Sequence, residues 1–394
     1  MDVQLKRVPE QVIVITGASS GIGLVTAKMA ARRGASVVLV ARNEWDLGRA
    51  VDAIRAEGGR AAYVVCDVAD RAQIERVAER AIGEFGRIDT WVNNAAVSMY
   101  GRLQDVPVED MRRQFDVNYW GMVYGSLVAV PHLKRQGGAL INIASALADR
   151  AIPLQGNYSA AKHAMKAFTD SLRMELEEEG APVSVTLVKP GSIDTPFFQK
   201  ARVYIDREPQ PVPPVYSPEL CARTILECAE RPVRDVLVSG MAKVISVAGT
   251  VAPRLTDYYM ERTTTESQKT DVPIAPGRRD NLYEPVEDDG GERGRYAGRV
   301  SEHSIYTHAS LHPRQALVAG SALGLALAAG WRALRRNKAA GKEDERAMVA
   351  GGEPPADLRP PHSEQPGDAG VLGRARAAQT PAAAAIDAAP EARR

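Results

Sequence analysis

The amino-acid sequence predicts an α/β fold: a doubly wound parallel sheet of about seven strands, followed by a largely irregular C-terminal extension. Between residues 11 and 189, short apolar, β-branched runs alternate with longer amphipathic patterns. The runs are apolar almost throughout, as in strands buried on both faces, and do not alternate as in a half-exposed sheet. Helical patterns between successive runs supply the crossovers that parallel strands need.

The bounds of the predicted strands and helices follow from local sequence patterns. The predicted strands cover residues 12–16, 36–40, 62–66, 90–92, 139–143, 183–188 and 235–238. The predicted helices cover residues 22–33, 44–57, 71–85, 108–134, 158–179 and 218–230. Asp70 precedes the third helix as a candidate N-cap, and Gly137 and Gly138 mark the turn before the fifth strand. Because Pro131 has no backbone N–H, we expect it to interrupt the fourth helix.

Composition narrows the class of protein. The chain has 394 residues, of which 45% are apolar and 25% are charged, and both fractions are ordinary for a globular protein. The net charge of +1 provides no global field for nucleic acid, so no nucleic-acid partner is expected. Cys66, Cys221 and Cys228 form no CxxC pair and are expected to be reduced in a cytoplasmic compartment. No apolar segment precedes Pro9, so no signal peptide is expected.

The organisation along the chain suggests one catalytic domain with appendages. The expected divisions are a nucleotide-binding catalytic domain at residues 1–260, an extended linker at 261–310, an apolar helix at 311–338 and a disordered tail at 339–394. Within the first, residues 196–218 are irregular and rich in proline. Such a segment at the carboxyl side of a sheet is either a lid over a substrate or a plain surface loop.

An uncharged segment stands near the C-terminus. Residues 316–331 contain only apolar and small residues, with a basic flank at residues 332–338. This is a little short of the roughly 17–25 residues that span a bilayer as a helix. Membrane association through this segment and packing on the body or on a partner both stay open. His303, His308 and His312 have no cysteine or carboxylate at ligand spacing, so no metal site is expected.

A glycine-rich turn follows the first strand. Residues 16–23 read Thr-Gly-Ala-Ser-Ser-Gly-Ile-Gly and lead into a helix. Glycine lets the backbone turn tightly and lets a pyrophosphate approach the helix N-terminus, where free N–H groups favour an anion. The predicted phosphate-binding residues are Gly17, Ser19, Ser20, Gly21, Ile22 and Gly23.

The end of the second strand predicts the cofactor. An NAD site usually places a carboxylate here for the ribose 2′-hydroxyl, and Ala41 provides none. Arg42 instead provides a cation that suits a 2′-phosphate. We therefore expect a preference for NADP(H), with NAD(H) as the alternative. Asp67 and Val68, just after the third strand, are candidates for the adenine edge.

The stretch from residue 140 to residue 168 joins an apolar strand to a helix. Ser145 follows the strand at the sheet edge where open α/β sheets bind ligands. Tyr158 and Lys162 are four residues apart, which places them on one face of the helix. A hydroxyl, a phenol and an ammonium therefore converge. The alternative interpretation is a buried strand, a core tyrosine and a solvated lysine.

The ordered set of motifs resembles the short-chain dehydrogenase/reductase family. It consists of residues 16–23, Asn93-Asn94-Ala95, Asn118, Ser145, Tyr158, Lys162 and Pro190-Gly191. The resemblance covers residues 11–238 and implies a Rossmann fold. It also implies hydride transfer between a nicotinamide cofactor and a carbonyl or alcohol carbon. A homo-oligomer, with residues 108–130 and 158–179 as contact faces, is implied by the resemblance alone.

The resemblance also implies roles for individual residues. Tyr158 corresponds to the general acid/base, and Lys162 to the residue that lowers its pKa and binds the nicotinamide ribose. Ser145 corresponds to the donor that holds the substrate oxygen, and Asn118 to the residue that orders a proton-relay water. The remaining cofactor-binding residues implied are Asn94, Ala95, Pro190, Gly191, Ile193 and Thr195. The family usually has glycine where this chain has Ala96, which puts cofactor affinity in question.

The sequence therefore predicts an NADP(H)-dependent oxidoreductase. Its substrate is expected to be a small molecule with a carbonyl or secondary alcohol. Phe197, Phe198 and Tyr204 favour an apolar one. A serine hydrolase is not expected, because the Gly-x-Ser-x-Gly motif is absent. The alternative is a cofactor-sensing or scaffolding protein recruited through its C-terminal tail.

Overall fold

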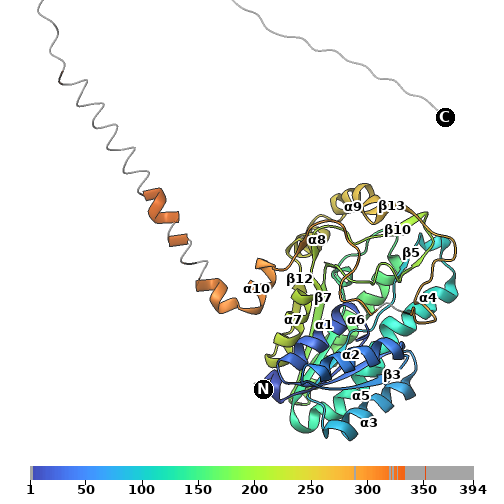
Figure 1. Ribbon diagram of the computed structural model, residues 1–394. Coiled ribbons are helices and arrows are strands. Elements are labelled where there is room, and N and C mark those ends of the chain that lie inside the picture. Colours follow the sequence, from blue (N-terminus) through green and yellow to red (C-terminus); the bar gives the residue numbers. More distant parts are fainter. Residues whose placement is uncertain are drawn as a thin grey trace, which may run out of the picture. The chain divides into compact units, whose positions relative to one another are not determined.

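A seven-stranded parallel sheet forms the centre of the computed structural model (Figure 1). The structure describes residues 3–287, 290–318, 321, 324, 325, 327–332 and 351. The strands are β1 (Val12–Thr16), β2 (Ser36–Ala41), β3 (Arg60–Val65), β4 (Thr90–Asn93), β6 (Gly138–Ile143), β7 (Val183–Pro190) and β12 (Asp235–Val238). Their order across the sheet is β12-β7-β6-β4-β1-β2-β3. The predicted doubly wound α/β class is confirmed.

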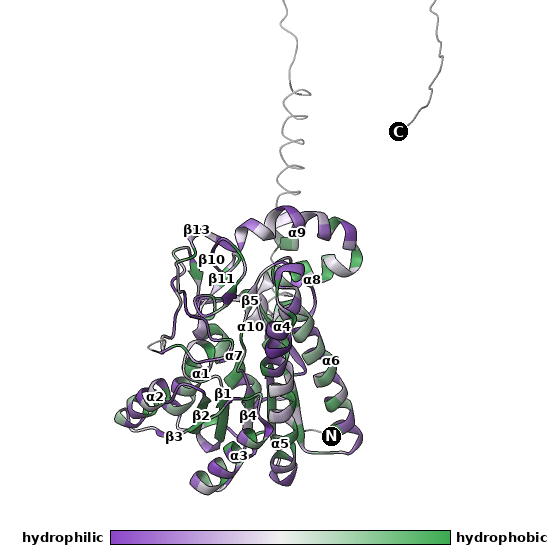
Figure 2. Ribbon diagram, turned by 90° about the vertical axis from the view of Figure 1, so that its right-hand side faces the viewer, coloured by the Kyte–Doolittle hydropathy of each residue, from purple (hydrophilic) through white to green (hydrophobic). Residues whose placement is uncertain are grey.

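Helices cover both faces of the sheet. They are α1 (Gly21–Arg32), α2 (Glu44–Ala56), α3 (Arg71–Phe85), α4 (Val108–Phe115), α5 (Gly121–Gln136), α6 (Gly156–Glu178) and α7 (Pro218–Glu230). One core cluster joins α1, α2 and α7 to side chains such as Ile13 and Leu39. The other joins α3, α5 and α6 to Val14 and Leu140. Neighbouring strand residues thus enter opposite cores, which explains why the strand sequences are apolar throughout (Figure 2).

The strand order places a ligand crevice next to β1. Chain order runs outward from β1 to β2 and β3, and then resumes on the other side of β1 with β4. The crossovers after β1 and β4 therefore leave in opposite directions, and a crevice opens at the carboxyl ends of these strands. The functional residues predicted from the sequence follow the carboxyl ends of the sheet strands, or lie at the start of α1, on α6 or in the turn between α4 and α5.

The predicted interruption at Pro131 is wrong. Helix α5 runs through Pro131, because its buried neighbours Val130 and Leu133 hold this part of the helix against the sheet at the cost of one hydrogen bond. The irregularity lies earlier, at the π-turn Asp116–Trp120 between α4 and α5. There the N–H of Gly121 bonds to the carbonyl of Asp116.

The segment from residue 261 to residue 310 packs on the sheet domain and does not run free as a linker. Helices α8 (Gly240–Val251) and α9 (Pro253–Ser267) lead to β13 (Lys269–Pro273), which pairs with β10 (Arg207–Pro209) (Figure 1). Further on, β14 (Val300–Ser301) joins β11 (Val215–Tyr216) and β8 (Ser192–Ile193). Helix α10 (Ile305–Leu311) follows. The pair β5 (Met99–Tyr100) and β9 (Arg202–Val203) completes the small sheets.

Single residues anchor this extension. Leu282 is fully buried and belongs to the core cluster of α3, α5 and α6. Arg278 forms an ion pair with Glu208, with Nε and Oε2 2.8 Å apart. It also donates to the carbonyls of Phe198 and Gln199. Because Leu282 and Arg278 are single anchors in a polar stretch, no hydrophobic periodicity in the sequence predicts that this segment is packed.

The far C-terminus is described only in part. Residues 1–323 form one unit and residues 324–394 another, and the elements named above all lie in the first. Residues 319, 320, 322, 323, 326 and 333–338 of the predicted apolar helix, and the predicted tail at 339–394 except for residue 351, lie outside the described residues. Within the described part of the chain, no helix combines the length and apolarity needed to cross a membrane.

Removing the Leu282 anchor tests whether the extension is part of the folded body. We expect Leu282→Ala to lower the free energy of unfolding by about 2–5 kcal/mol, because it removes a fully buried side chain and leaves a cavity. The matched control Leu255→Ala, at a position 70% exposed on α9, should cost about 0.5 kcal/mol or less. Urea unfolding measures both values. Equal effects would contradict an integral extension.

Candidate active site

A cavity of about 330 Å³ lies at the carboxyl ends of the central strands. It extends from the glycine-rich turn after β1 to the N-terminal part of α6. Most of the residues predicted from the sequence line it. They are Gly17, Ser19, Ser20, Gly21, Ile22, Arg42, Asp67, Val68, Asn94, Ala95, Ser145, Tyr158, Lys162, Pro190, Gly191, Ile193 and Thr195. Gly23 and Asn118 do not line the cavity and lie behind its wall.

The glycine-rich turn needs its glycines for two different reasons. Gly17 and Gly21 have φ values of +67° and +53°, which disfavour any side chain. Gly23 has ordinary helical backbone, but a Cβ there would lie 2.3 Å from the carbonyl oxygen of Gly17. Gly23 therefore allows α1 to pack under the turn, and it supports the cavity wall from behind.

Thr16 and Asn94 join this turn to the end of β4. The Asn94 side chain donates to the carbonyls of Thr16, at 2.9 Å, and of Gly17, at 3.2 Å. In return, the Thr16 hydroxyl accepts from the backbone N–H groups of Asn94 and Ala95, at 2.9 and 3.0 Å. The Asn94 amide is thus a clamp that holds two walls of the cavity together. Ala96, where the family usually has glycine, lines the cavity beside it.

Helix α6 presents Tyr158 and Lys162 to the same end of the cavity. The Lys162 side chain is 1% exposed, and its ammonium donates to the carbonyl of Ile143 at the end of β6, at 2.9 Å. The same nitrogen lies 5.4 Å from the centre of the Tyr158 ring. Ser145 follows β6, and its hydroxyl accepts from the backbone N–H of Leu147 at 3.1 Å. Phenol, ammonium and hydroxyl therefore converge as expected, and Lys162 is not solvated.

Burial changes the proton affinity of both groups on α6. It lowers the pKa of Lys162 from 10.5 to about 7, because the charged ammonium loses water. It raises the pKa of Tyr158 well above the ordinary value for a phenol, and a hydrogen bond with Ser145 partly offsets this rise. Without a bound ligand, Tyr158 is therefore a protonated phenol at neutral pH. Additional positive charge is needed to make it a better acid.

Asn118 occupies the π-turn and does not face the cavity. Its side chain is fully buried and forms hydrogen bonds with both the N–H and the carbonyl of Val97. The amide accepts from the Val97 N–H at 2.8 Å and donates to the Val97 carbonyl at 3.0 Å. Its amide thus holds the wall residue Val97 in place.

Arg42 stands at the end of β2 and lines the cavity. Its guanidinium donates to the carbonyl of Tyr283 at 2.6 Å and also to the carbonyl of Asn281. Asp67, the candidate adenine contact, pairs with Arg113 at 2.5 Å. Residues of the extension are therefore in direct contact with Arg42, the residue predicted to bind the 2′-phosphate.

Lys200 lines the cavity although no sequence motif predicts it there. Lys200, in the irregular segment 196–218, is 7% exposed, and its ammonium donates to the Ser20 hydroxyl of the glycine-rich turn at 2.7 Å. No motif marks it, because its position depends on how that irregular segment folds back. The end of the cavity near Tyr158 is mainly apolar. It is lined by Leu147, Ile152, Phe197, Phe198, Val212, Pro213, Pro214, Met241, Ile245 and Met260. The segment 196–218 therefore contributes part of the cavity wall.

Comparison with known proteins identifies relatives of the chain. Residues 11–204 match the family model described as short chain dehydrogenase. A Bacillus subtilis protein named "uncharacterized oxidoreductase YxnA" is 47% identical over 327 residues, which are 81% of this chain and 90% of YxnA. A match of that length includes part of the C-terminal extension. A Mycobacterium tuberculosis protein named "putative oxidoreductase SadH" is 32% identical over 60% of this chain and 89% of its own length.

Solved structures share the fold. A short-chain dehydrogenase/reductase from Burkholderia phymatum in complex with NAD has a TM-score of 0.56 at 26% identity, covering 70% of this chain and 100% of its own. L-sorbose reductase from Gluconobacter frateurii, in complex with NADPH and L-sorbose, has a TM-score of 0.52 at 27% identity, covering 61% and 98%. Structural neighbours therefore bind either form of the dinucleotide.

The lowered pKa of Lys162 predicts a pH-dependent contribution to stability. The unfolded chain binds more protons at this residue than the folded protein between about pH 7 and 10.5. The contribution of Lys162 is therefore fully present above the unfolded value and is lost as the pH falls through about 7. Wild type should gain stability relative to Lys162→Met as the pH rises through this window, measured by urea unfolding. A difference between the two that does not change with pH would contradict the buried ammonium.

Proposed function

The chain belongs to the short-chain dehydrogenase/reductase family, and we propose that it transfers a hydride between NADP(H) and the carbonyl or secondary-alcohol carbon of an apolar substrate. The observation that carries the proposal is that Tyr158, Lys162 and Ser145 line the same cavity as the glycine-rich turn. The wall at the glycine-rich turn and the wall at α6 would hold the two ends of a dinucleotide. The first wall contains the N-terminus of α1, and the second contains the acid/base groups.

The residues present fit such a cofactor. The turn around Gly17 leads into the N-terminus of α1, where the helix dipole favours an anion, while the Gly21 N–H itself donates to the carbonyl of Gly291. Beside it, the ammonium of Lys200 donates to the Ser20 hydroxyl. Pro190, Gly191, Ile193 and Thr195 form the wall on the β7 side. When bound, the nicotinamide supplies or takes up the hydride. The remaining chemistry belongs to side chains of this chain.

Tyr158 is the proposed general acid/base. In the direction of reduction, the phenol gives its proton to the substrate oxygen as the carbon receives the hydride, and a phenolate remains. The Ser145 hydroxyl holds the same oxygen and orients it toward Tyr158. Lys162 stabilises the phenolate when protonated and so opposes the effect of burial on the Tyr158 pKa. In the direction of oxidation, the phenolate takes the proton back.

Arg42 supports a preference for NADP(H). It carries the positive charge at the end of β2, and the preceding Ala41 offers no carboxylate to a ribose hydroxyl. The planar guanidinium of Arg42 has five N–H donors, an arrangement that suits a phosphate. The apolar lining near Tyr158, with Phe197 5.9 Å from the Tyr158 ring, supports an apolar substrate.

Exposed apolar residues support the homo-oligomer. Trp120, Leu127 and Met174 are 43%, 45% and 57% exposed, and they lie on or beside α5 and α6. These are the helices that the family resemblance assigns to subunit contacts. A second copy of the chain is the proposed partner that covers them.

Replacement of the proposed acid tests the mechanism. Tyr158→Phe should reduce turnover of a ketone panel by about 10²–10⁴-fold, because general acid/base catalysis contributes that much. NADPH binding, measured by fluorescence, should change little. Tyr259→Phe, at a position 58% exposed on α9, serves as the control and should be as active as wild type.

Two results would contradict this mechanism. Full turnover by Tyr158→Phe would exclude the phenol as the acid. Tight NADPH binding by the wild type with no turnover of ketones, aldehydes or secondary alcohols would instead favour the cofactor-sensing alternative.

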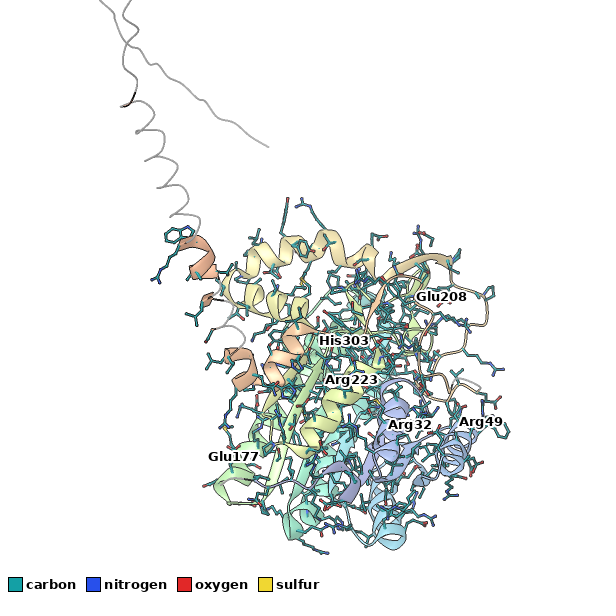
Figure 3. The ribbon with its side chains drawn as sticks, turned by 60° about the vertical axis from the view of Figure 1, so that its left-hand side comes forward. Arg32, Arg49, Glu177, Glu208, Arg223 and His303 are labelled. Atoms are coloured by element: carbon teal, nitrogen blue, oxygen red, sulfur yellow. The ribbon has the colours of Figure 1, made fainter. Side chains whose placement is uncertain are left out.

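Replacement of Arg42 tests cofactor choice. Arg42→Ala should weaken NADPH binding by about 10–100-fold, because a charge-assisted hydrogen bond contributes about 1.5–3 kcal/mol. NADH binding should change far less. Arg49→Ala removes an exposed arginine of the neighbouring helix α2 (Figure 3) and should leave both affinities unchanged. Equal losses for NADPH and NADH would show that Arg42 does not select the phosphate.

A further inference from the structure

A segment of the extension lies across the adenosine end of the cavity. We name residues 278–287 and 290–292 the strap. Asn281, Pro285 and Val286 of the strap line the same cavity as Arg42 and Asp67. The strap therefore forms a wall of this cavity and leaves space beneath it.

At the phosphate side, the strap bonds to the glycine-rich turn. The carbonyl of Gly291 accepts from the N–H of Gly21 at 2.9 Å, at the first residue of α1. One helical turn further on, Lys28 forms an ion pair with Glu292, with Nζ and Oε1 2.6 Å apart. Neither Lys28 nor Glu292 lines the cavity, so this ion pair holds the strap from outside.

At the ribose side, strap carbonyls accept from residues around β2 and α4. Arg42 donates to the carbonyls of Asn281 and Tyr283, Asn43 to that of Val286 at 3.0 Å, and Arg113 to that of Leu282 at 3.1 Å. The Tyr283 hydroxyl donates to Asp110 at 2.7 Å. The buried Leu282 side chain fixes this part of the strap in the core.

The strap also holds the segment that contributes part of the wall at the apolar end of the cavity. The N–H of Asn281 donates to the carbonyl of Lys200 at 2.9 Å. Arg278 pairs with Glu208 of β10, a residue labelled in Figure 3. Beyond the strap, Arg223 of α7 donates to the carbonyl of Glu302 at 2.6 Å, beside His303 in Figure 3. The strap is thus fixed on both sides of the cavity.

Within the described part of the chain, the strap has one buried side-chain oxygen without a hydrogen-bond partner. The side-chain oxygen of Asn281 is buried and accepts no hydrogen bond. Leaving a buried acceptor unsatisfied costs about 1–3 kcal/mol, so such atoms usually meet a ligand or a water. Asn281 lies in the cavity wall next to Arg42, where a hydroxyl or amine donor of an adenosine would satisfy its oxygen.

We propose that the strap is an integral wall of the cofactor site, which closes over the adenosine half of NADP(H) and slows its release. Asn281 is the strap residue in contact with the cofactor. This inference rests on the proposed function. Its physical basis is that a dinucleotide under the strap leaves only after hydrogen bonds and the Lys28–Glu292 ion pair have opened.

A charge swap outside the cavity tests the retention. Lys28→Glu and Glu292→Lys each place like charges together and loosen the strap without touching the cavity, and the double variant restores an ion pair in reverse. The release rate of NADPH is measured by stopped-flow fluorescence with a trapping ligand, after thermal melting has shown that each variant folds. Each single variant should release NADPH about fivefold faster, which corresponds to about 1 kcal/mol. The double variant should return to within about twofold of wild type.

Substitution of the contact residue provides the second arm. Asn281→Ala should weaken NADPH binding at equilibrium by about fivefold, the loss of one hydrogen bond. Unchanged affinity in this variant would overturn the Asn281 contact.

The possible outcomes separate the strap from the proposed function. Release of NADPH at the wild-type rate in both single variants would show that the strap does not retain the cofactor. Slower release or tighter binding in these variants would show that the strap competes with the cofactor, and this result would also overturn the proposal. In each of these cases wild type still binds NADPH, so the proposed function stands. If wild type binds neither NADPH nor NADH, both proposals fall.

Discussion

A buried ammonium at the carboxyl edge of the sheet is the interaction on which the site depends. Lys162 reaches from α6 to the carbonyl of Ile143 at the end of β6, and so fixes the helix that carries Tyr158 against the strand that leads to Ser145. The cost of its burial is visible in its pKa of about 7. Because removing a charged lysine from water is energetically unfavourable, a lysine in the core indicates a role beyond packing. In our proposal that use is to tune the phenol of Tyr158.

Much of the fold could be predicted from local sequence. Strands buried on both faces are apolar throughout, so β1, β2 and β6 are recognisable one by one, and the helices between them require a parallel sheet. The spacing of Tyr158 and Lys162 places both on one helical face. These features depend on neighbours in the sequence, and that is why they can be read without the structure.

Other features depend on distant contacts and could not be predicted. Leu282 and Arg278 are single anchors in a polar stretch, so a packed extension looks like a linker. Lys200 enters the cavity only because an irregular segment folds back over it. The Asn118 amide forms its hydrogen bonds with the backbone of Val97, and the spacing of these residues in the sequence does not predict that contact. Tertiary packing decided each of these positions.

The site therefore has two contributors. The sheet and its helices supply the glycine-rich turn and the side chains on α6, and the extension supplies the strap beside Arg42. The similarity to YxnA includes part of this extension as well as the sheet. Such a division lets one scaffold keep its chemistry while segments outside it shape access to the cavity.

An ultraviolet titration of the tyrosine phenolate tests directly whether Lys162 and the cofactor tune Tyr158. The titration is recorded as the difference between wild type and Tyr158→Phe, with and without NADP⁺. Burial alone keeps Tyr158 protonated to high pH. The positive charge of the oxidised cofactor, together with Lys162, should shift this titration to lower pH. A phenolate signal that appears at lower pH when NADP⁺ is added would support the account. A titration that NADP⁺ leaves unchanged would contradict it.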